Sequence, residues 1–393
     1  MIETQDIPGF FADRTTLDLS RYVMLRYRFE TDADPKFAAA SLCSEQSTAQ
    51  WHRPGSTEDL RPQFAAKVVA LNAKSGVVDV TIAHPWENFG AKLPNLIAAV
   101  AGEGAFYAPM VKAIKLMDIE FPDAYLKQFE GPQFGIKGSR DIFKIEGRPF
   151  FIGVVKPNLG LPPEQFAELA YESWVGGLDI AKDDEMLGDM TWSPLADRAR
   201  AAGLARRRAE KETGTPKCYL ACISDEVYDL PSLYKTAVEN GANAVMINPI
   251  CTGISAARQL RRISEVPVMG HFAGVAVSGR VSNFGVASVV WTKLMRLAGC
   301  DWIGIAGFGP RMQCSDEEVM ANVRACWEPM GNIAQALPIP GGSDTAETLP
   351  MVAQKVGSPD FGFISGRGVF GHEQGPRAGA TSLHQAWKNV API

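Results

Sequence analysis

The chain has 393 residues, of which 46% are hydrophobic, with a formal net charge of −5 and a pI near 5.7. This length and composition allow two globular domains with a sizeable core. The weak negative charge leaves no electrostatic footprint for nucleic acid or an anionic membrane, so we expect neither partner. No run of about 18 apolar residues predicts a membrane span.

Cysteine usage and the start of the chain bear on the compartment. Seven cysteines are scattered without a C-x-x-C pair, and the acidic start MIETQDIPGF lacks the apolar stretch of a signal peptide. We therefore expect reduced thiols and a cytoplasmic location.

Residues 1–135 predict an N-terminal α+β domain of ferredoxin-like type. RYVMLRYRFE (21–30) and VVDVTIAHPWE (77–87) indicate strands, whereas DPKFAAASLCSEQ (34–46) and LPNLIAAVAGE (93–103) indicate helices. The run GPQFG before residue 136 is typical of a linker between two domains.

Residues 136–393 repeat one pattern eight times, a short apolar run followed by a helical segment. The runs begin at residues 150, 178, 218, 244, 266, 301, 336 and 361. Uninterrupted apolar strands between helices predict a parallel sheet, and eight such units fit a closed (β/α)8 TIM barrel. An open doubly wound sheet is the alternative, but the G-x-G-x-x-G turn that it needs is missing.

Ionisable residues gather where the second barrel strand ends. In such a barrel the active site lies at the carboxyl ends of the strands. Lys182 and Asp184 are two residues apart, so both point into the barrel mouth, whereas Asp183 points outward and is structural. Glu185 joins them if the strand ends there. The cluster indicates either a salt bridge or a site for Mg²⁺, which prefers carboxylate oxygens.

Lys156 and Asn158 also share a face, at the end of the first barrel strand. Burial lowers the pKa of a lysine, and such a lysine can remove a proton from carbon next to a carbonyl. A snorkelling surface lysine is the alternative. His271 is the one histidine of five that ends a barrel strand, where it serves either catalysis or structure.

Glycines follow the seventh and eighth barrel strands, where barrels commonly bind phosphate through backbone N–H groups. Gly341, Gly342, Gly366 and Gly368 allow close approach of the backbone, and Arg367 could add a bidentate contact. We predict a phosphate site there, although loop glycines also serve as plain turns.

The blocks GRPFFIGVVKPNLGL, GGLDIAKDDE, HFAG, PIPGG and SGRGVFGH occur in the same order as in the RuBisCO large-subunit superfamily, which the chain resembles over most of its length. The resemblance implies that Lys182 is carbamylated by CO₂ and binds Mg²⁺ with Asp184 and Glu185. It also implies that Lys156 abstracts a proton and that His271 contacts the substrate.

The segment EQSTAQW resembles the part of that family that reaches a neighbouring subunit's active site. By this resemblance Glu45 and Trp51 contribute to a partner's site, which implies a homodimer or a higher homo-oligomer.

Several positions depart from the RuBisCO pattern. A second lysine is Asn158, an arginine is Phe272, a strand-six histidine is Gly304, and an N-terminal asparagine is Glu103. The serine before the strand-seven glycines is missing, and the loop lysine needed for carboxylation has no clear equivalent, with Arg311 nearest.

These departures resemble the RuBisCO-like proteins (form IV) of the family. They imply an Mg²⁺-dependent enzyme that enolises a phosphorylated sugar derivative carrying one phosphate, leading to isomerisation or tautomerisation without CO₂ fixation. Two alternatives stay open: a decarboxylase of a β-keto sugar-acid phosphate, and a barrel with a non-catalytic regulatory or binding role.

Overall fold

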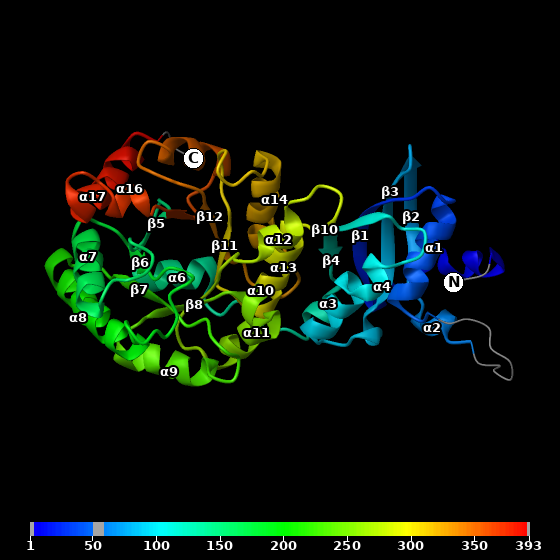
Figure 1. The fold of residues 1–393 in the computed structure, drawn as a ribbon, viewed down its shortest axis with the longest axis horizontal. Helices are drawn as coiled ribbons and strands as arrows, with labels where there is room; N and C mark the ends of the chain where they lie inside the picture. Colours follow the sequence, from blue (N-terminus) through cyan, green and yellow to red (C-terminus); the bar gives the residue numbers. More distant parts are fainter. Residues whose placement is uncertain (1–3, 50–58, 391–393) are drawn as a thin grey trace. The chain divides into compact units, whose positions relative to one another are not determined.

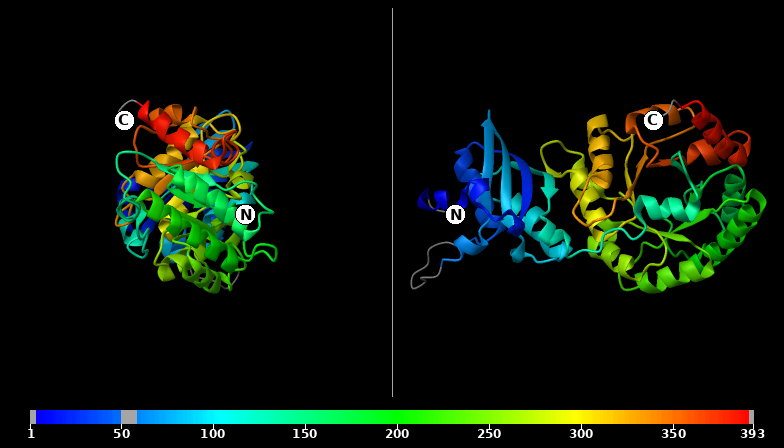
Figure 2. Two further views of the ribbon diagram at one scale, coloured as in Figure 1. Left: turned by 90° about the vertical axis from the view of Figure 1, so that its left-hand side faces the viewer. Right: turned by 180° about the vertical axis from the view of Figure 1, so that it is seen from behind.

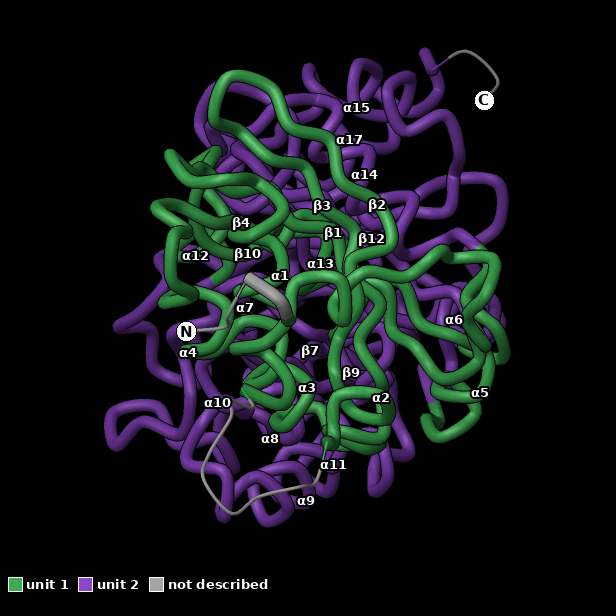
Figure 3. Tube along the Cα trace, turned by 90° about the vertical axis from the view of Figure 1, so that its right-hand side faces the viewer, with its two compact units in different colours: residues 1–130, 275–294, 329–333 green, residues 131–274, 295–328, 334–393 purple. Residues whose placement is uncertain are grey.

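The computed structural model describes residues 4–49 and 59–390 and divides into two compact units (Figure 3). Unit 1 comprises residues 1–130, 275–294 and 329–333, and unit 2 comprises the remainder. The two short segments 275–294 and 329–333 lie within the span expected for the barrel, yet their contacts group them with the N-terminal part of the chain.

Unit 1 is built on a five-stranded sheet with the order β10-β4-β1-β3-β2. The strands are β1 (Tyr22–Glu30), β2 (Lys67–Lys74), β3 (Val77–Pro85), β4 (Ala113–Glu120) and β10 (Gly285–Val286). β1 pairs antiparallel with both β3 and β4, and β2 pairs antiparallel with β3. Its helices are α1 (Pro35–Gln46), α2 (Arg61–Phe64), α3 (Leu93–Ala101), α4 (Glu103–Phe106), α5 (Asp123–Leu126) and α12 (Val275–Gly279), and α13 (Ser288–Ala298) begins in it. The α+β character expected for the N-terminal part is confirmed.

A tight hairpin turn joins two of these strands. Lys74 pairs with Val77, which leaves Ser75 and Gly76 as a two-residue loop with φ of 51° and 79°. Positive φ at both positions matches the turn type whose twist suits neighbouring antiparallel strands. The sequence did not predict β2, the first strand of this hairpin, or β4, which lies between β10 and β1.

Two lysines hold the later segment of unit 1 in place. Lys115 of β4 donates to the carbonyl oxygens of Gly279 and Val281, each at 2.6 Å. Lys293 of α13 pairs with Asp118 of β4 at 2.6 Å. Because these partners are more than 150 positions apart in the chain, the grouping is a tertiary feature that local patterns do not reveal.

Unit 2 is the barrel predicted from the eight repeats (Figure 1). Its strand order is β12-β11-β9-β8-β7-β6-β5-β13, and neighbouring strands in this order pair in parallel. The two outermost strands in this order, β12 and β13, also contact each other, so the sheet is nearly closed. The strands are β5 (Phe150–Val154), β6 (Ile180–Lys182), β7 (Cys218–Cys222), β8 (Ala244–Ile247), β9 (Val268–Gly270), β11 (Trp302–Ala306), β12 (Leu337–Gly341) and β13 (Gly362–Ile364).

Helices surround this sheet and cover its outer face (Figures 1 and 2). The helices of unit 2 are α7 (Pro163–Val175), α8 (Leu195–Thr213), α9 (Leu230–Asn240), α10 (Pro249–Thr252), α11 (Ile254–Ile263), α14 (Asp316–Trp327), α15 (Leu349–Val356), α16 (Arg367–Phe370) and α17 (Gly375–Lys388), together with α6 (Gly135–Phe143), which instead packs against the barrel interior through Ile136 and Phe143. Gly214 and Gly357 end α8 and α15 in the left-handed conformation, which glycine adopts without a steric penalty. No helix within residues 4–49 or 59–390 has the length and apolar character needed to cross a membrane.

The barrel interior is filled by every second residue of the strands. The buried interior cluster includes Phe150 and Ile152 of β5, Ile180 of β6, and Leu337 and Ile339 of β12. Side chains two apart point to the same side of a strand, so this inward face continues from Ile180 towards the carboxyl end. The residues that continue it are polar, and they form the mouth of the barrel.

Candidate active site at the barrel mouth

A cavity of about 240 Å³ lies at the carboxyl ends of the barrel strands. The predicted site residues that line it are Lys156, Asn158, Lys182, Asp184, Glu185, His271, Gly341, Gly366 and Arg367. Phe272, Arg311, Met312, Ser343 and Asp344 complete most of its wall. The strand ends thus bring together side chains that are up to 211 positions apart in the sequence, from residue 156 to residue 367.

Lys182 lies at the floor of this cavity with a fully buried side chain. Its Nζ finds no hydrogen-bond partner among the described residues, and Glu185 Oε2 is 3.6 Å away, within ion-pair range but too far for a good hydrogen bond. Burial lowers the pKa of Lys182, although Glu185 and Asp184 act in the opposite sense. Desolvation therefore favours an uncharged, nucleophilic amine at this position.

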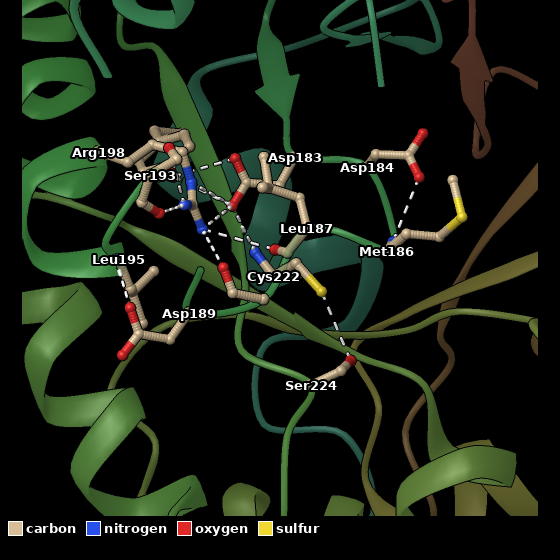
Figure 4. Close-up of polar contacts among 12 residues, drawn as sticks. Asp183, Asp184, Met186, Leu187, Asp189, Ser193, Leu195, Arg198, Cys222 and Ser224 are labelled. Atoms are coloured by element: carbon tan, nitrogen blue, oxygen red, sulfur yellow. Dashed lines mark hydrogen bonds and ion pairs between the residues drawn. The ribbon is translucent and has the colours of Figure 1, made fainter. Parts of the chain in front are cut away.

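Asp183 points away from the cavity, as the alternation along β6 predicts (Figure 4). Its carboxylate accepts hydrogen bonds from Arg198 of α8 at 3.2 Å, from the Cys222 backbone at 2.9 Å and from the Tyr219 hydroxyl at 3.1 Å. Asp183 and Arg198 are both fully buried. The pair fastens the end of β6 to the helix outside it and thereby fixes the direction of Asp184.

Lys156 extends into the cavity from the end of β5. Its ammonium donates to the Asn158 side-chain oxygen and lies 3.2 Å from Asp184 Oδ2. The side chain is 26% exposed, so Lys156 is neither a snorkelling surface residue nor a fully buried one. Gly366 leaves room for it, because a Cβ there would stand 3.0 Å from Lys156 Cε.

His271 ends β9 and faces Glu185 across the cavity, with Nε2 3.5 Å from Glu185 Oε2. Burial lowers the pKa of His271 to about 3, so the imidazole is neutral at physiological pH. Its Nδ1 accepts the Ala273 backbone N–H at 3.2 Å, which leaves the proton on Nε2 and directs a donor into the cavity. Asn248 of the loop after β8 supports Glu185 by donating to its backbone oxygen at 2.9 Å.

The glycine-rich side of the cavity is formed by the ends of β12 and β13. Gly341, Gly366 and Arg367 line the cavity itself. Gly342 lies just behind this wall, and Gly368 faces a neighbouring hollow that it shares with Arg367. A Cβ at Gly368 would stand 2.5 Å from Ser365 Oγ, so close packing already requires a glycine there.

Of the two residues expected to serve a partner subunit, the structure describes Glu45 alone. Glu45 is half-buried near the end of α1 in unit 1, where its carbonyl oxygen would be 2.4 Å from a Cβ at Gly104 of α4. Glu103 begins α4, so the two glutamates stand at adjoining helix ends. Trp51 falls outside the described residues.

Two residues of the cavity wall were not recognised as site residues from the sequence. Asp344 is 6% exposed and follows the glycine pair of β12 by two positions. Phe272 was noted only as a departure, yet its ring stacks on His271 with centroids 4.7 Å apart. The only available signal was their position in the chain, because both lie within three residues of the end of a barrel strand.

The loop after β12 adopts a backbone conformation that needs support. Ser343 has φ of 82°, a region that costs a non-glycine residue about 1–3 kcal/mol. Arg311 of the loop after β11 donates to the Ser343 hydroxyl at 3.1 Å. This contact ties the two loops together at the edge of the cavity.

Within the described part of the chain, no three His, Cys, Asp or Glu side chains are grouped closely enough to hold a metal ion. Asp184 and Glu185 supply two carboxylates beside Lys182, whereas the third carboxylate of the cavity, Asp344, lies on its glycine-rich side. A modified Lys182 could add a third anionic oxygen beside Asp184 and Glu185, because its buried amine lies 3.6 Å from Glu185 Oε2.

Comparison with known proteins agrees with this architecture, an α+β unit preceding a (β/α)8 barrel with ionisable side chains at its mouth. Residues 18–125 match the family model "Ribulose bisphosphate carboxylase large chain, N-terminal domain", and residues 135–391 match the model of its catalytic domain. The chain therefore belongs to the RuBisCO large-chain family, and its relatives include RuBisCO-like proteins.

Among its relatives, RuBisCO-like protein 2 of Rhodopseudomonas palustris is 55% identical, over 98% of this chain and 93% of that protein. The RuBisCO-like protein of Allochromatium vinosum is 54% identical, over 98% and 88%. Among solved structures, the octameric RuBisCO of Pyrococcus horikoshii OT3, in complex with a sulfate ion, superposes with a TM-score of 0.92 at 29% identity and covers 98% of this chain and 92% of its own. The dimeric archaeal RuBisCO of Hyperthermus butylicus gives a TM-score of 0.89 at 28% identity, over 98% and 95%.

The Asp183–Arg198 pair generates a stability prediction. Arg198→Met leaves a buried carboxylate without its cation, so we expect the free energy of unfolding to fall by about 3–5 kcal/mol. The matched control on the same helix is Arg200→Met, whose partner Asp197 is exposed, and it should change stability by less than about 0.5 kcal/mol. Urea unfolding of both variants measures the difference, and equal midpoints would contradict the role given to Arg198.

Proposed function

We propose that the protein is an Mg²⁺-dependent enzyme that enolises a phosphorylated sugar derivative and leads to isomerisation or tautomerisation without fixing CO₂. The observation that carries the proposal is the convergence of Lys156, Lys182, Asp184 and Glu185 on one cavity, with the Lys182 amine buried and unpartnered among the described residues. A lysine base beside anionic oxygens is what proton removal next to a carbonyl requires.

The donor set fits a magnesium ion. Asp184 and Glu185 provide hard oxygen ligands, and addition of CO₂ to the uncharged Lys182 amine would give a carbamate oxygen with release of one proton. When bound, Mg²⁺ supplies Lewis-acid polarisation of the substrate carbonyl. Asp184 Oδ2 pairs with Lys156 in the structure and is also an expected ligand of the metal. Binding of Mg²⁺ to this carboxylate would weaken the ion pair between Asp184 and Lys156.

The protein's own side chains divide the remaining work. The Lys156 amine removes the proton from carbon, and Asn158 holds its nitrogen in position. The neutral His271 donates from Nε2 to a substrate oxygen in the cavity. On the opposite side, the backbone of Gly341 and Gly366 and the Arg367 guanidinium bind the phosphate.

Phe272 and Gly304 support a substrate with a single phosphate. The Phe272 ring lies 3.2 Å from the point that a Cβ at Gly304 would occupy, so it fills the space that a side chain on β11 would need. These are the positions where RuBisCO is expected to carry an arginine and a histidine. Two phosphate donors are thus replaced together by one apolar ring.

Oligomerisation belongs to the same proposal. The structural relatives from Pyrococcus horikoshii and Hyperthermus butylicus are octameric and dimeric, respectively. We propose a homodimer or a higher homo-oligomer for this chain as well, in which Glu45 and Trp51 reach the cavity of a partner subunit.

The central test is solvent proton exchange. With phosphorylated ketose candidates in D₂O and Mg²⁺, the wild-type protein should place deuterium next to the carbonyl, as followed by NMR. Lys156→Met should slow this exchange by about 10²–10⁴-fold, because it removes the general base. Lys211→Met, on the exposed end of α8, is the control and should keep full activity.

The same deuterium-exchange reactions distinguish the alternative functions. Release of CO₂ together with deuterium would identify a decarboxylase of a β-keto acid instead. Exchange that persists at the wild-type rate in Lys156→Met would remove the proposed base, and no exchange with any candidate would favour a binding role.

Carbamylation of Lys182 has its own measurement. With ¹³C-bicarbonate and Mg²⁺, the protein should show one carbamate signal by ¹³C NMR, and Lys182→Met should abolish it. Lys217 is the matched control, since burial also lowers its pKa but its Nζ donates to the Leu178 carbonyl at 3.0 Å. A signal that disappears in Lys217→Met and survives in Lys182→Met would reverse the assignment.

Substrate charge can be tested with a pair of reduced sugar phosphates that differ only in a second phosphate. We expect the bisphosphate to bind about 5–100-fold more weakly, since its second phosphate loses water without gaining a donor beside Phe272. Phe272→Arg should reduce the difference in affinity between the monophosphate and the bisphosphate. Equal affinities for the two ligands in calorimetry would count against a monophosphate substrate.

A further inference from the structure

Asp344 occupies an unexpected place for a carboxylate, the glycine-rich side of the cavity. It lines the cavity wall and is 6% exposed. Its Oδ2 accepts the backbone N–H of Gly342 at 3.1 Å, and its own carbonyl oxygen accepts the Ser365 hydroxyl at 2.6 Å. Both ends of the residue are therefore fixed, one to β12 and the other to the loop after β13.

In its ionised form, Asp344 disfavours the binding of an anion at this wall of the cavity. The Gly342 N–H is a backbone donor next to the lining residue Gly341, and in the structure the Asp344 carboxylate, which itself lines the cavity, already accepts from it. An ionised carboxylate beside a phosphate would also repel it through a poorly solvated space. The cations that face the same cavity, Lys156, Arg311 and Arg367, offset this repulsion without freeing the amide.

Protonation removes the repulsion and supplies a new donor in place of the occupied amide. A neutral carboxyl carries no charge, and its O–H can donate to an anion oxygen. Burial raises the pKa of Asp344 to about 6, although hydrogen bonds from Gly342 and Thr348 act in the opposite direction. The two forms of the residue therefore exchange within the ordinary working range of pH.

We propose that Asp344 determines which anions the glycine side of the cavity accepts: as a carboxylate it takes the place of a ligand oxygen on the Gly342 N–H, and as a neutral carboxyl it donates to the ligand. This inference rests on the phosphate site of the proposed function. In the bound complex, one proton is present on either the phosphoryl group or Asp344. The complex therefore contains a monoanionic phosphate beside an ionised Asp344, or a dianionic phosphate beside a neutral Asp344.

Inorganic sulfate is the appropriate probe, because it stays a dianion across the pH range in which Asp344 titrates. For the wild-type protein, the sulfate affinity measured by calorimetry should rise by up to about 100-fold from pH 8 to pH 5, since only about 1% of Asp344 is neutral two pH units above its pKa. Asp344→Asn keeps an acceptor for Gly342 and imitates the neutral carboxyl. It should bind sulfate tightly at pH 8 and show little change with pH.

Asp344→Ala serves as the second variant, because it frees the Gly342 N–H without introducing a new donor, and it should also lose the pH dependence. The other ionisable groups of this face, Lys156, Arg311 and Arg367 in the cavity and Glu347 and His372 in the adjoining hollow, are unchanged in both variants. Any pH dependence of the sulfate affinity that both substitutions remove can therefore be assigned to Asp344.

The outcomes separate this inference from the function on which it rests. Sulfate binding that weakens in Arg367→Ala but has the same pH dependence in wild type and Asp344→Asn would overturn the role of Asp344 and leave the phosphate site standing. Absence of sulfate binding in the wild type and in both Asp344 variants would overturn the phosphate site and the inference together. Proton exchange that requires Lys156 would still support enolisation in either case.

Discussion

A lysine amine buried among carboxylates, yet without a hydrogen-bond partner among the described residues, constrains the rest of the barrel mouth. A charged ammonium at Lys182 would lose its hydration and gain only Glu185 Oε2 at 3.6 Å in return. Desolvation outweighs the attraction of Glu185 and Asp184 and lowers the pKa of Lys182. A simple salt bridge is therefore an incomplete description of the cluster, because Asp184 pairs with Lys156 at 3.2 Å and Lys182 approaches only Glu185, at 3.6 Å.

The alternation of side chains along β6 gives neighbouring aspartates opposite tasks. Asp183 accepts hydrogen bonds from Arg198, Tyr219 and the Cys222 backbone on the outer side of the barrel. Asp184 instead faces Lys156 on the inner side. Because the outer pair is fully buried and hydrogen-bonded, β6 cannot slip by one residue without exchanging these environments. Structural rigidity on one side of the strand thus sets the geometry of the proposed catalyst on the other.

Small and large residues are matched along the cavity wall. Phe272 uses the volume that Gly304 leaves free, and Gly366 leaves room for the stem of Lys156. On the glycine side, Ser343 has a positive φ and its hydroxyl accepts from Arg311, while Asp344 accepts the Gly342 N–H. The cavity therefore has an aromatic wall next to His271 and a polar wall at the ends of β12 and β13.

The sequence by itself determined the barrel, the order of its strands along the chain, and the inward direction of Lys156, Lys182 and Asp184. Those features follow from hydrophobic periodicity and the two-residue repeat of a strand, which are local. Only the tertiary structure showed that residues 275–294 group with unit 1, that the Lys182 amine has no hydrogen-bond partner among the described residues, and that Asp344 accepts the Gly342 backbone N–H. These depend on which atoms distant segments bring within hydrogen-bond range, and no local pattern of residues encodes that distance.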